Sequence, residues 1–392
     1  MFDFLRPFKR KKTEITLLLD IGTEAVKALV LQKNGEKIHI LSKSLEYFDN
    51  YGVFDSRNFE RDILKKTILK TFRNLTPGDL KGKTNLSVFL GLPPDILKVR
   101  VVSQILKREK PEKIIDEKEE KAIRLEASEQ AKKKISQTYS QDSGILPQDL
   151  QFINLKILEI KIDGYRISGL RGYNGEKLDF RILTTFLPES YLKEIENICQ
   201  EVDLKNKEII HEAEGLTSHF RDNPDGIFLD VGGATTQIFL VKAGRLEAVS
   251  EFEAGGKIFS QALSEKLGFK EQDSRIFKEK YSKRELSEES SERIKEILYF
   301  SFQTWFENLK SKLKEMREST LLPSNIILFG GGSKLPEFKE ILKAGPWENL
   351  LLDPKPNLEI FQPANLKIFE QEIKSFDYAQ YIPSLLIYYA NA

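Results

Sequence analysis

The chain is 392 residues long, which is enough for two or more domains that each bury a core of their own. It carries 61 lysines and arginines against 60 aspartates and glutamates, and this balance excludes a general electrostatic attraction to nucleic acid. Its single cysteine, Cys199, excludes an intramolecular disulfide and a cysteine-based zinc cluster, and it predicts a reducing, cytoplasmic setting.

Residues 1–13 are predicted to form a basic and apolar tail. Its basic and apolar residues are interleaved: Phe2, Phe4, Leu5, Arg6, Phe8, Lys9, Arg10, Lys11 and Lys12. The tail lacks the apolar core of a secretory signal, and nowhere does the sequence approach the roughly 20 apolar residues of a spanning helix. Two interpretations stay open for residues 1–12, a segment lying on an anionic membrane surface or a disordered solubilising tail.

The region 14–83 is predicted to be a first α/β lobe that opens with a β-meander. The expected strands are 15–19, 25–31 and 37–41. An Asn34-Gly35 pair between the second and third strands predicts a tight hairpin turn. A helix is expected over 58–74, where apolar residues recur at helical spacing.

An inserted α+β subdomain is predicted over 84–187. Its expected elements are a strand at 85–92, a charged helix at 111–137 and strands at 151–162 and 178–186. The chain is then expected to return to the first lobe over 188–220.

A second lobe is predicted over 221–380, because the order of the first lobe returns 210 positions later, counted from Asp20 to Asp230. A repeat of a whole meander at this long period predicts two similarly built lobes rather than a solenoid. A helical subdomain is expected at about 257–324. The expected elements are strands at 226–229, 236–241, 245–249 and 325–329, and helices at 257–267, 287–317, 336–342 and 381–389.

The break between the first two strands carries Asp20, Gly22 and Thr23, and Lys27 follows in the next strand. A carboxylate at the end of a buried strand can hold Mg²⁺ through water, and a glycine turn lets backbone N–H groups approach phosphate oxygens. Alone this motif is unspecific, since many ordinary turns contain it.

The matching break in the second lobe makes the interpretation more specific. It contains Asp230, Gly232, Gly233, Thr235 and Thr236. Two such turns facing each other would clamp a triphosphate from both sides, with two carboxylates sharing one hydrated cation. A third loop, Gly330-Gly331-Gly332, lies between a strand and a helix, where the helix N-terminus favours an anion or the adenosine side of a nucleotide. A P-loop is excluded because GxxxxGK[ST] does not occur, and no GxGxxG supports a dinucleotide fold.

Taken in this order, the three motifs resemble the two phosphate motifs and the adenosine motif of the actin, sugar-kinase and heat-shock chaperone superfamily. The resemblance implies an α/β fold of the actin-like (ribonuclease-H-like) type, with two lobes and an inserted small α+β subdomain. It implies ATP and Mg²⁺ as ligands, with the metal held through water by Asp20 and Asp230. It also identifies 209–220 and 381–392 as the two helices that connect the lobes.

The insertion decides the branch within this superfamily. Its position, its opening strand SVFLGLP and its return strand LDFRILTTFLP are similar to the extra subdomain of the bacterial cell-division protein FtsA and its pilus relative PilM. The loop with Gly255 and Gly256 is similar to a segment that follows the second phosphate motif in FtsA. The resemblance covers residues 14–392.

Several residues depart from the superfamily pattern. Ala234 stands where a third glycine is usual, and Gln237 stands where an aspartate is usual. ATP binding is expected to survive these changes, and hydrolysis is expected to be slow or absent. Glu212 aligns with the acidic residue that positions water in some relatives, which makes it the candidate catalytic residue, with Glu214 as its competitor.

The resemblance implies a cytoplasmic protein that assembles at the inner face of the cell membrane and forms filaments with itself. An FtsA-like role in cell division, with an FtsZ-like partner, is the leading hypothesis, although 280–286 is short where FtsA receives FtsZ. The alternative is a PilM-like role in a type IV pilus or secretion platform, with a PilN-like partner. A nucleotide-free adaptor of the same fold also stays open. A small-molecule kinase is not favoured, because no general-base aspartate follows the insertion, and nucleic acid is not an expected partner.

Overall fold

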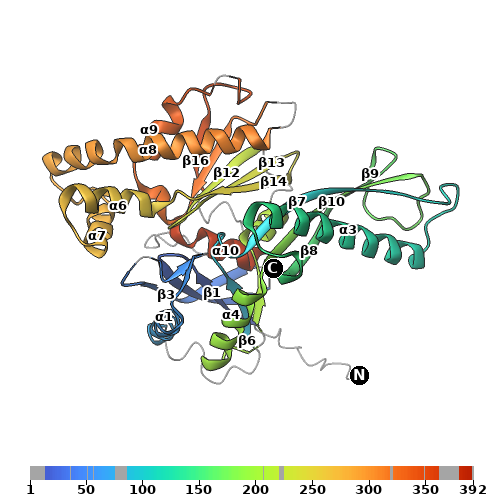
Figure 1. Ribbon diagram of the computed structural model, residues 1–392, viewed down its shortest axis with the longest axis horizontal. Coiled ribbons are helices and arrows are strands. Elements are labelled where there is room, and N and C mark those ends of the chain that lie inside the picture. Colours follow the sequence, from blue (N-terminus) through green and yellow to red (C-terminus); the bar gives the residue numbers. More distant parts are fainter. Residues whose placement is uncertain are drawn as a thin grey trace, which may run out of the picture.

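The computed structural model describes residues 14–35, 37–50, 52–55, 57–75, 86–205, 207–219, 225–317, 321–347, 349–361 and 379–390. Figure 1 shows two lobes, one on either side of the C-terminal helix, and a third unit that projects to one side. The tail at 1–13, with its predicted membrane contact, lies outside the described residues. In the part of the chain that is described, no helix has the length and apolar character needed to cross a membrane.

The first-lobe sheet has the strand order β11-β6-β1-β2-β3. Its strands are β1 (Glu14–Ile21), β2 (Ala25–Asn34), β3 (Lys37–Tyr47), β6 (Leu86–Gly91) and β11 (Lys207–Ile209). The first three form the predicted antiparallel meander, whereas β6 and β11 run parallel to β1. Side chains alternate along β1. Leu17 and Leu19 pack under helices α1 (Arg61–Arg73) and α4 (Glu189–Glu201), and Leu18 packs on the opposite face, towards the second lobe.

Several predicted boundaries differ from the structure. The helix expected at 111–137 runs over Glu117–Ser143, because Asp116 caps its start and Gly144 its end. The strand expected at 85–92 belongs to the first lobe and not to the insertion, because β6 pairs with β1 in the centre of the sheet. The inserted subdomain therefore begins after Gly91 rather than at 84. The helix expected from residue 58 begins at Arg61, because β5 (Asn58–Phe59) pairs with β4 (Phe54–Asp55) in a short hairpin.

The second-lobe sheet repeats the topology of the first, with the order β14-β13-β12-β15-β16. Its strands are β12 (Gly226–Val231), β13 (Thr236–Lys242), β14 (Arg245–Phe252), β15 (Asn325–Phe329) and β16 (Asn357–Ile360). The register repeats as well, since Asp20 lies opposite Lys27 in the first lobe and Asp230 lies opposite Gln237 in the second. The helices of this lobe are α6 (Gly256–Leu267), α7 (Glu271–Ser282), α8 (Glu288–Met316) and α9 (Glu337–Ala344).

Two short helices, α5 (Glu212–His219) and α10 (Ile382–Tyr389), pack between the sheets of the two lobes, where connecting helices were expected. Their apolar residues form one core cluster together with Leu18 of β1 and Phe228 of β12, so this core belongs to both lobes. The helices meet at Gly215, where a Cβ would overlap the carbonyl oxygen of Leu386. Glycine permits this direct contact between the two helix backbones.

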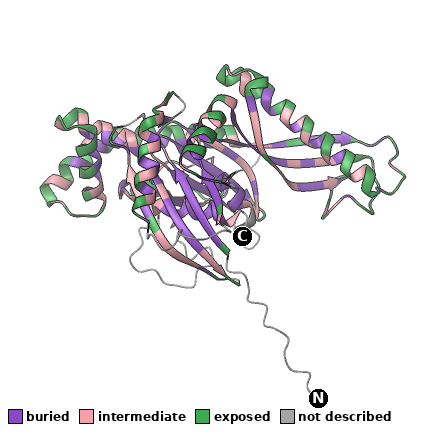
Figure 2. Cartoon of the chain, turned by 90° about the horizontal axis from the view of Figure 1, so that it is seen from below, coloured by how far each residue is buried: buried purple, intermediate pink, exposed green. Residues whose placement is uncertain are grey.

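The inserted subdomain is an antiparallel sheet with one long helix on one face. Its strand order is β7-β10-β8-β9. Its elements are β7 (Lys98–Lys107), α3 (Glu117–Ser143), β8 (Leu150–Ile162), β9 (Tyr165–Ile167) and β10 (Lys177–Pro188). The helix begins after Asp116, whose side chain accepts the Glu119 N–H, and it ends at Gly144, whose φ of 74° is left-handed. Figure 2 shows the sheet buried under α3, whose outer face is exposed.

Charged side chains join the insertion to the second lobe. Glu251 of β14 accepts hydrogen bonds from Arg100 at 2.7 and 2.8 Å and from Lys98 at 3.1 Å, both of β7. Burial alone would raise the pKa of Glu251, but the two cations outweigh it and lower that pKa. Arg245 of β14 donates to Glu159 of β8 at 2.9 Å. The insertion, which is covalently part of the first lobe, is thus bound to the second.

Candidate functional site

The two predicted turns lie face to face between the lobes. In the first, the Gly22 N–H donates to the carbonyl oxygen of Ala25 at 2.9 Å, and in the second Gly232 donates in the same way to Thr235 at 3.0 Å. The turns also touch each other, because the Ala234 N–H donates to the Thr23 hydroxyl at 2.9 Å. The sequence repeat is therefore a structural repeat whose two copies border one site.

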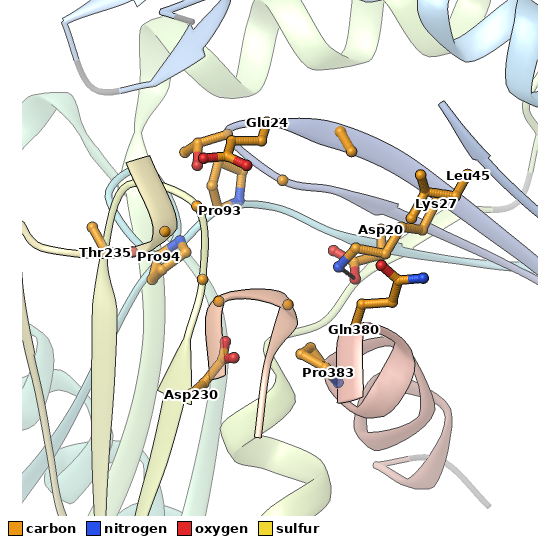
Figure 3. Close-up of a pocket in the computed structure, with 18 of the residues that line it drawn as sticks. Asp20, Glu24, Lys27, Leu45, Pro93, Pro94, Asp230, Thr235, Gln380 and Pro383 are labelled. Atoms are coloured by element: carbon orange, nitrogen blue, oxygen red, sulfur yellow. Dashed lines mark hydrogen bonds and ion pairs between the residues drawn. The ribbon is translucent and has the colours of Figure 1, made fainter. Parts of the chain in front are cut away.

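A cavity of about 330 Å³ lies at these turns, within the usual size range of small-ligand pockets. Figure 3 shows Asp20 and Lys27 of the first lobe, Asp230 of the second lobe, and Gln380 and Pro383 of the C-terminal segment around it. The predicted site residues that line the cavity are Asp20, Gly22, Thr23, Lys27, Glu212, Asp230, Gly232, Gly233, Thr235, Gly256, Gly331 and Gly332.

Thr236 does not line the cavity, although the sequence placed it among the phosphate-binding residues. It is fully buried, and its hydroxyl donates to the carbonyl oxygen of Ala254 and accepts the Trp305 indole N–H at 2.9 Å. The Thr236 hydroxyl thus donates one hydrogen bond and accepts another inside the second-lobe core. Thr236 points into this core because strand side chains alternate, and Thr235 takes the cavity side.

Gly255 and Gly330 stand behind the cavity lining and act through the backbone. The N–H after Gly255, that of Gly256, donates to the carbonyl oxygen of Gly232 at 2.8 Å and so braces the second turn. Gly330 has a φ of 89°, and a Cβ there would overlap the Asp230 carboxylate. Only glycine adopts this φ readily and also lacks the Cβ that would overlap Asp230. The loop Gly330-Gly331-Gly332 can therefore approach the end of β12 closely.

Two donors from distant parts of the chain hold Asp20. Lys27 Nζ donates to Asp20 Oδ2 at 2.9 Å, and Ser384 Oγ donates to the same oxygen at 2.7 Å. Burial alone would lower the pKa of Lys27, but the carboxylates of Asp20, Asp230 and Glu212 outweigh it and raise that pKa. Lys27 therefore keeps its charge inside the site.

Asp230 and Glu212 are two further acids of the cavity lining, which also contains Glu24 and Glu279. No amide, hydroxyl or cationic group of the described residues donates to Asp230 Oδ1 or to either oxygen of Glu212. Burial, with repulsion from Asp20, raises the pKa of Asp230 to about 7. Burial, with repulsion from Asp230 and Asp20, raises the pKa of Glu212 well above its usual value. Buried carboxyl oxygens in this state call for a proton, a donor or a cation.

These features fit a hydrated Mg²⁺ and a phosphate chain. Asp230 and Glu212 have unsatisfied oxygens at a glycine-lined cavity, and a bound cation would favour the ionised form of both acids. Within the described ranges, no three His, Cys, Asp or Glu side chains stand close enough to ligate a metal ion by themselves. Asp20 and Asp230, the two predicted ligands, line the same cavity and so fit a cation that binds through water and phosphate oxygens.

Gln237, which departs from the usual aspartate, is fixed by His211. Burial lowers the pKa of His211 to about 3, so its ring is neutral at pH 7. The ring Nδ1 accepts the Ala213 N–H at 3.0 Å, which leaves the proton on Nε2. Because Nε2 lies 3.1 Å from the Gln237 amide, we assign the amide oxygen to that position. A neutral amide held in this way cannot act as a general base.

Glu214, the competitor of Glu212, faces the insertion instead of the cavity. One of its oxygens accepts the Thr185 hydroxyl at 2.9 Å, and the Asn154 amide donates to the other. Glu214 therefore ties α5 to β8 and β10. Of the two candidate acids on α5, only Glu212 lines the cavity.

The lobes also touch each other where α7 borders the cavity. No pattern in the sequence predicts this contact. Arg275 of α7 lies over the Tyr47 ring of β3 at 4.2 Å and donates to the carbonyl oxygen of Phe48 at 3.0 Å. Lys278 also lines the cavity, and its Nζ donates to the carbonyl oxygen of Gly256 at 2.7 Å. Burial lowers the pKa of Lys278. The helical pattern of α7 fixes its apolar face but not which lobe its charged side chains reach.

Comparison with solved structures decides the fold. A chain of the PilM–PilN type IV pilus biogenesis complex aligns with a TM-score of 0.65 over 95% of this chain and 97% of that chain, at 15% identity. The chain has the actin-like fold. At this identity the likeness concerns the fold alone. No protein-family model matches the sequence, and neither does any curated protein.

Two further actin-like matches are weaker. EutJ, the ethanolamine utilization protein from Carboxydothermus hydrogenoformans, aligns with a TM-score of 0.49 at 12% identity, over 99% of this chain and 92% of that chain. MreB 5 of Spiroplasma citri, bound to AMPPNP, aligns with a TM-score of 0.47 at 12% identity, over 93% of this chain and 98% of that chain. The match with the chain of the PilM–PilN complex confirms the predicted actin-like fold. The two weaker matches add nothing to it.

Proposed function

We propose that this actin-like protein binds ATP between its lobes and serves as an assembly component of a type IV pilus or secretion platform. The observation that carries the proposal is the pair of matching turns, one from each lobe, that meet at a cavity lined by Asp20, Lys27, Glu212 and Asp230. The fold match with a chain of the PilM–PilN complex supports the pilus role over the division role expected first from the sequence. It supports a PilN-like partner, and nothing comparable supports an FtsZ-like one.

Each part of the site has a role in this proposal. Backbone N–H groups of the two turns, together with Lys27, would bind phosphate oxygens, and Gly331 and Gly332 would face the adenosine side. Asp20 and Asp230 would hold Mg²⁺ through water. A bound Mg²⁺ supplies the positive charge that the buried acids lack. Glu212 is the group placed to orient a water molecule.

Turnover in this proposal is slow or absent. The amide of Gln237 is hydrogen-bonded to His211 and offers no base. The raised pKa of Glu212 favours its protonated form, which is a poor base until a cation lowers that pKa. ATP then acts through its binding and not through its hydrolysis. By contacting both lobes at once, ATP favours one angle between them and so one assembly state, because a ligand shifts a conformational equilibrium only through contacts that differ between the states.

Assembly in this proposal takes place at the cytoplasmic face of the membrane. Copies of the chain would associate into filaments, and residues 1–12 would contact anionic lipid through their basic and apolar side chains. The neighbouring genes give a quick test of the role. Pilus assembly genes beside this gene support the pilus platform, and a tubulin-like division gene supports the FtsA-like alternative.

Gly331 allows a direct test of the nucleotide site. It lines the cavity, and a Cβ on it would meet only the Cβ of Gln380, at 3.6 Å. We expect the wild type to bind Mg-ATP in calorimetry, and Gly331→Leu to bind roughly tenfold more weakly or worse, because its side chain occupies the cavity while the fold is kept. Gly169→Leu is the control, since a Cβ on Gly169 meets no atom within 4 Å.

The outcomes distinguish nucleotide binding in this cavity from binding elsewhere and from no binding. Binding that Gly331→Leu weakens and Gly169→Leu leaves unchanged supports the proposed site. Absence of ATP binding by the wild type refutes it and favours the nucleotide-free adaptor. Equal affinity of all three proteins would place the nucleotide outside this cavity.

A further inference from the structure

The second connecting helix contains a serine that faces the interior. α10 has the sequence IPSLLIYY, and Ser384 within it is 1% exposed. A buried hydroxyl costs free energy unless it is hydrogen-bonded, and a helical serine often bonds a carbonyl oxygen of its own helix. Ser384 instead donates to Asp20, which lies 364 positions earlier in the chain.

The two donors to Asp20 come from different parts of the fold. Lys27 lies across from Asp20 in the first-lobe sheet, so its bond is kept as long as that sheet is intact. Ser384 lies on a helix between the lobes, and its bond depends on where that helix sits. Both bonds end on Oδ2, and together they fix the orientation of the carboxylate more firmly than either bond alone.

The same helix contacts the remaining parts of the site. Immediately before it, the carbonyl oxygen of Ala379 accepts the Gly330 N–H of the third loop at 3.0 Å. Within it, Leu386 lies against Gly215 of α5, the helix that begins with Glu212. The position of α10 is therefore linked to the third loop, to α5 and, through Ser384, to the end of β1.

We propose that Ser384 is a positioning residue that orients the Asp20 carboxylate for a hydrated cation and couples that orientation to α10. This inference rests on the proposed function of the cavity as a Mg-nucleotide site. The Ser384 hydroxyl then contributes to the Mg²⁺-dependent part of ATP binding, and it contributes little to the contacts that ATP makes with the turns themselves.

The test is calorimetric titration of ATP into the full-length protein, once with Mg²⁺ and once with EDTA. Ser384→Ala is expected to weaken binding about tenfold with Mg²⁺ and less than about twofold with EDTA, as for the loss of a group that orients a metal-binding carboxylate. Thr71→Val is the matched control. It removes a fully buried hydroxyl that bonds the carbonyl oxygen of Thr67 in its own helix and lies outside the cavity lining.

A selective loss in Mg²⁺, absent from Thr71→Val, supports the positioning role. An equal loss with and without Mg²⁺, or no loss in either, overturns it. If the wild type does not bind ATP at all, the proposed function falls, and this inference falls with it. If Ser384→Ala does not fold, Ser384→Cys keeps the size of the side chain with a weak donor. It must then show the same selective loss, and wild-type affinity in Mg²⁺ would refute the role.

Discussion

Asp230→Asn is expected to weaken Mg-ATP binding by about 100-fold and to stabilise the nucleotide-free protein. Asp230 is buried, and its Oδ1 accepts no hydrogen bond from an amide, hydroxyl or cationic group of the described residues, so its charge is unfavourable until a cation binds. Asparagine keeps the shape of the side chain and removes the charge. Calorimetry measures the affinity, and urea denaturation measures the free energy of unfolding.

The gain in stability from this substitution depends on pH. The pKa of Asp230 is about 7 in the folded chain, against an ordinary value of 3.8. A group whose folded pKa is raised stabilises the fold below its unfolded pKa, and this stabilisation is lost as the pH rises through the folded pKa. Through Asp230 the wild type is thus expected to lose up to about 3 kcal/mol between pH 5 and pH 8.

Asp62→Asn serves as the control for both measurements, because Asp62 is exposed on α1. It should leave the affinity and the pH profile of the wild type unchanged. If Asp230→Asn binds Mg-ATP as the wild type does and follows the same pH profile, then Asp230 neither meets the cation nor carries the buried charge described here.

Gly215→Ala is expected to lower the free energy of unfolding by about 3 kcal/mol. The added Cβ would overlap the carbonyl oxygen of Leu386, which is backbone and cannot rotate away as a side chain can. The connecting helices would have to separate, and the core cluster that they share with both sheets would loosen. Urea denaturation followed by circular dichroism measures the loss.

Gly169→Ala is the matched control for the helix contact. A Cβ on Gly169 meets no atom within 4 Å, so the change in unfolding free energy should stay within about 0.5 kcal/mol. Similar values for the two variants would mean that the helix contact at Gly215 does not determine how the lobes are held together.

The sequence could predict that the two turns face each other, because the two lobes repeat the same strand register. Asp20 pairs with Lys27 in one lobe and Asp230 with Gln237 in the other, so equal spacing in the sequence becomes equal geometry at two strand ends. The alternation of side chains between the two faces of a strand is also a local property that the sequence predicts. It would have placed Thr236 in the core, since its neighbour Thr235 takes the cavity side.

The parts that could not be predicted depend on contacts between distant segments. The pairing of β6 with β1 is parallel and non-local, and no turn between the strands signals it, so the start of the insertion was predicted too early. The bond from Ser384 to Asp20 depends on how α10 is rotated against the first lobe. Its only trace in the sequence is a lone serine within an apolar helix. The contact of Arg275 with Tyr47 depends on the angle between the lobes, which no local pattern encodes.

Hydrogen exchange with and without Mg-ATP tests the central claim most directly, because it follows both turns in one experiment. If the turns clamp one phosphate chain, the backbone amides of 21–25 and 231–235 slow down together when Mg-ATP is added, and they stay fast in Asp230→Asn. Protection of one turn without the other, or of neither while ATP binds, would contradict a site shared by the two lobes.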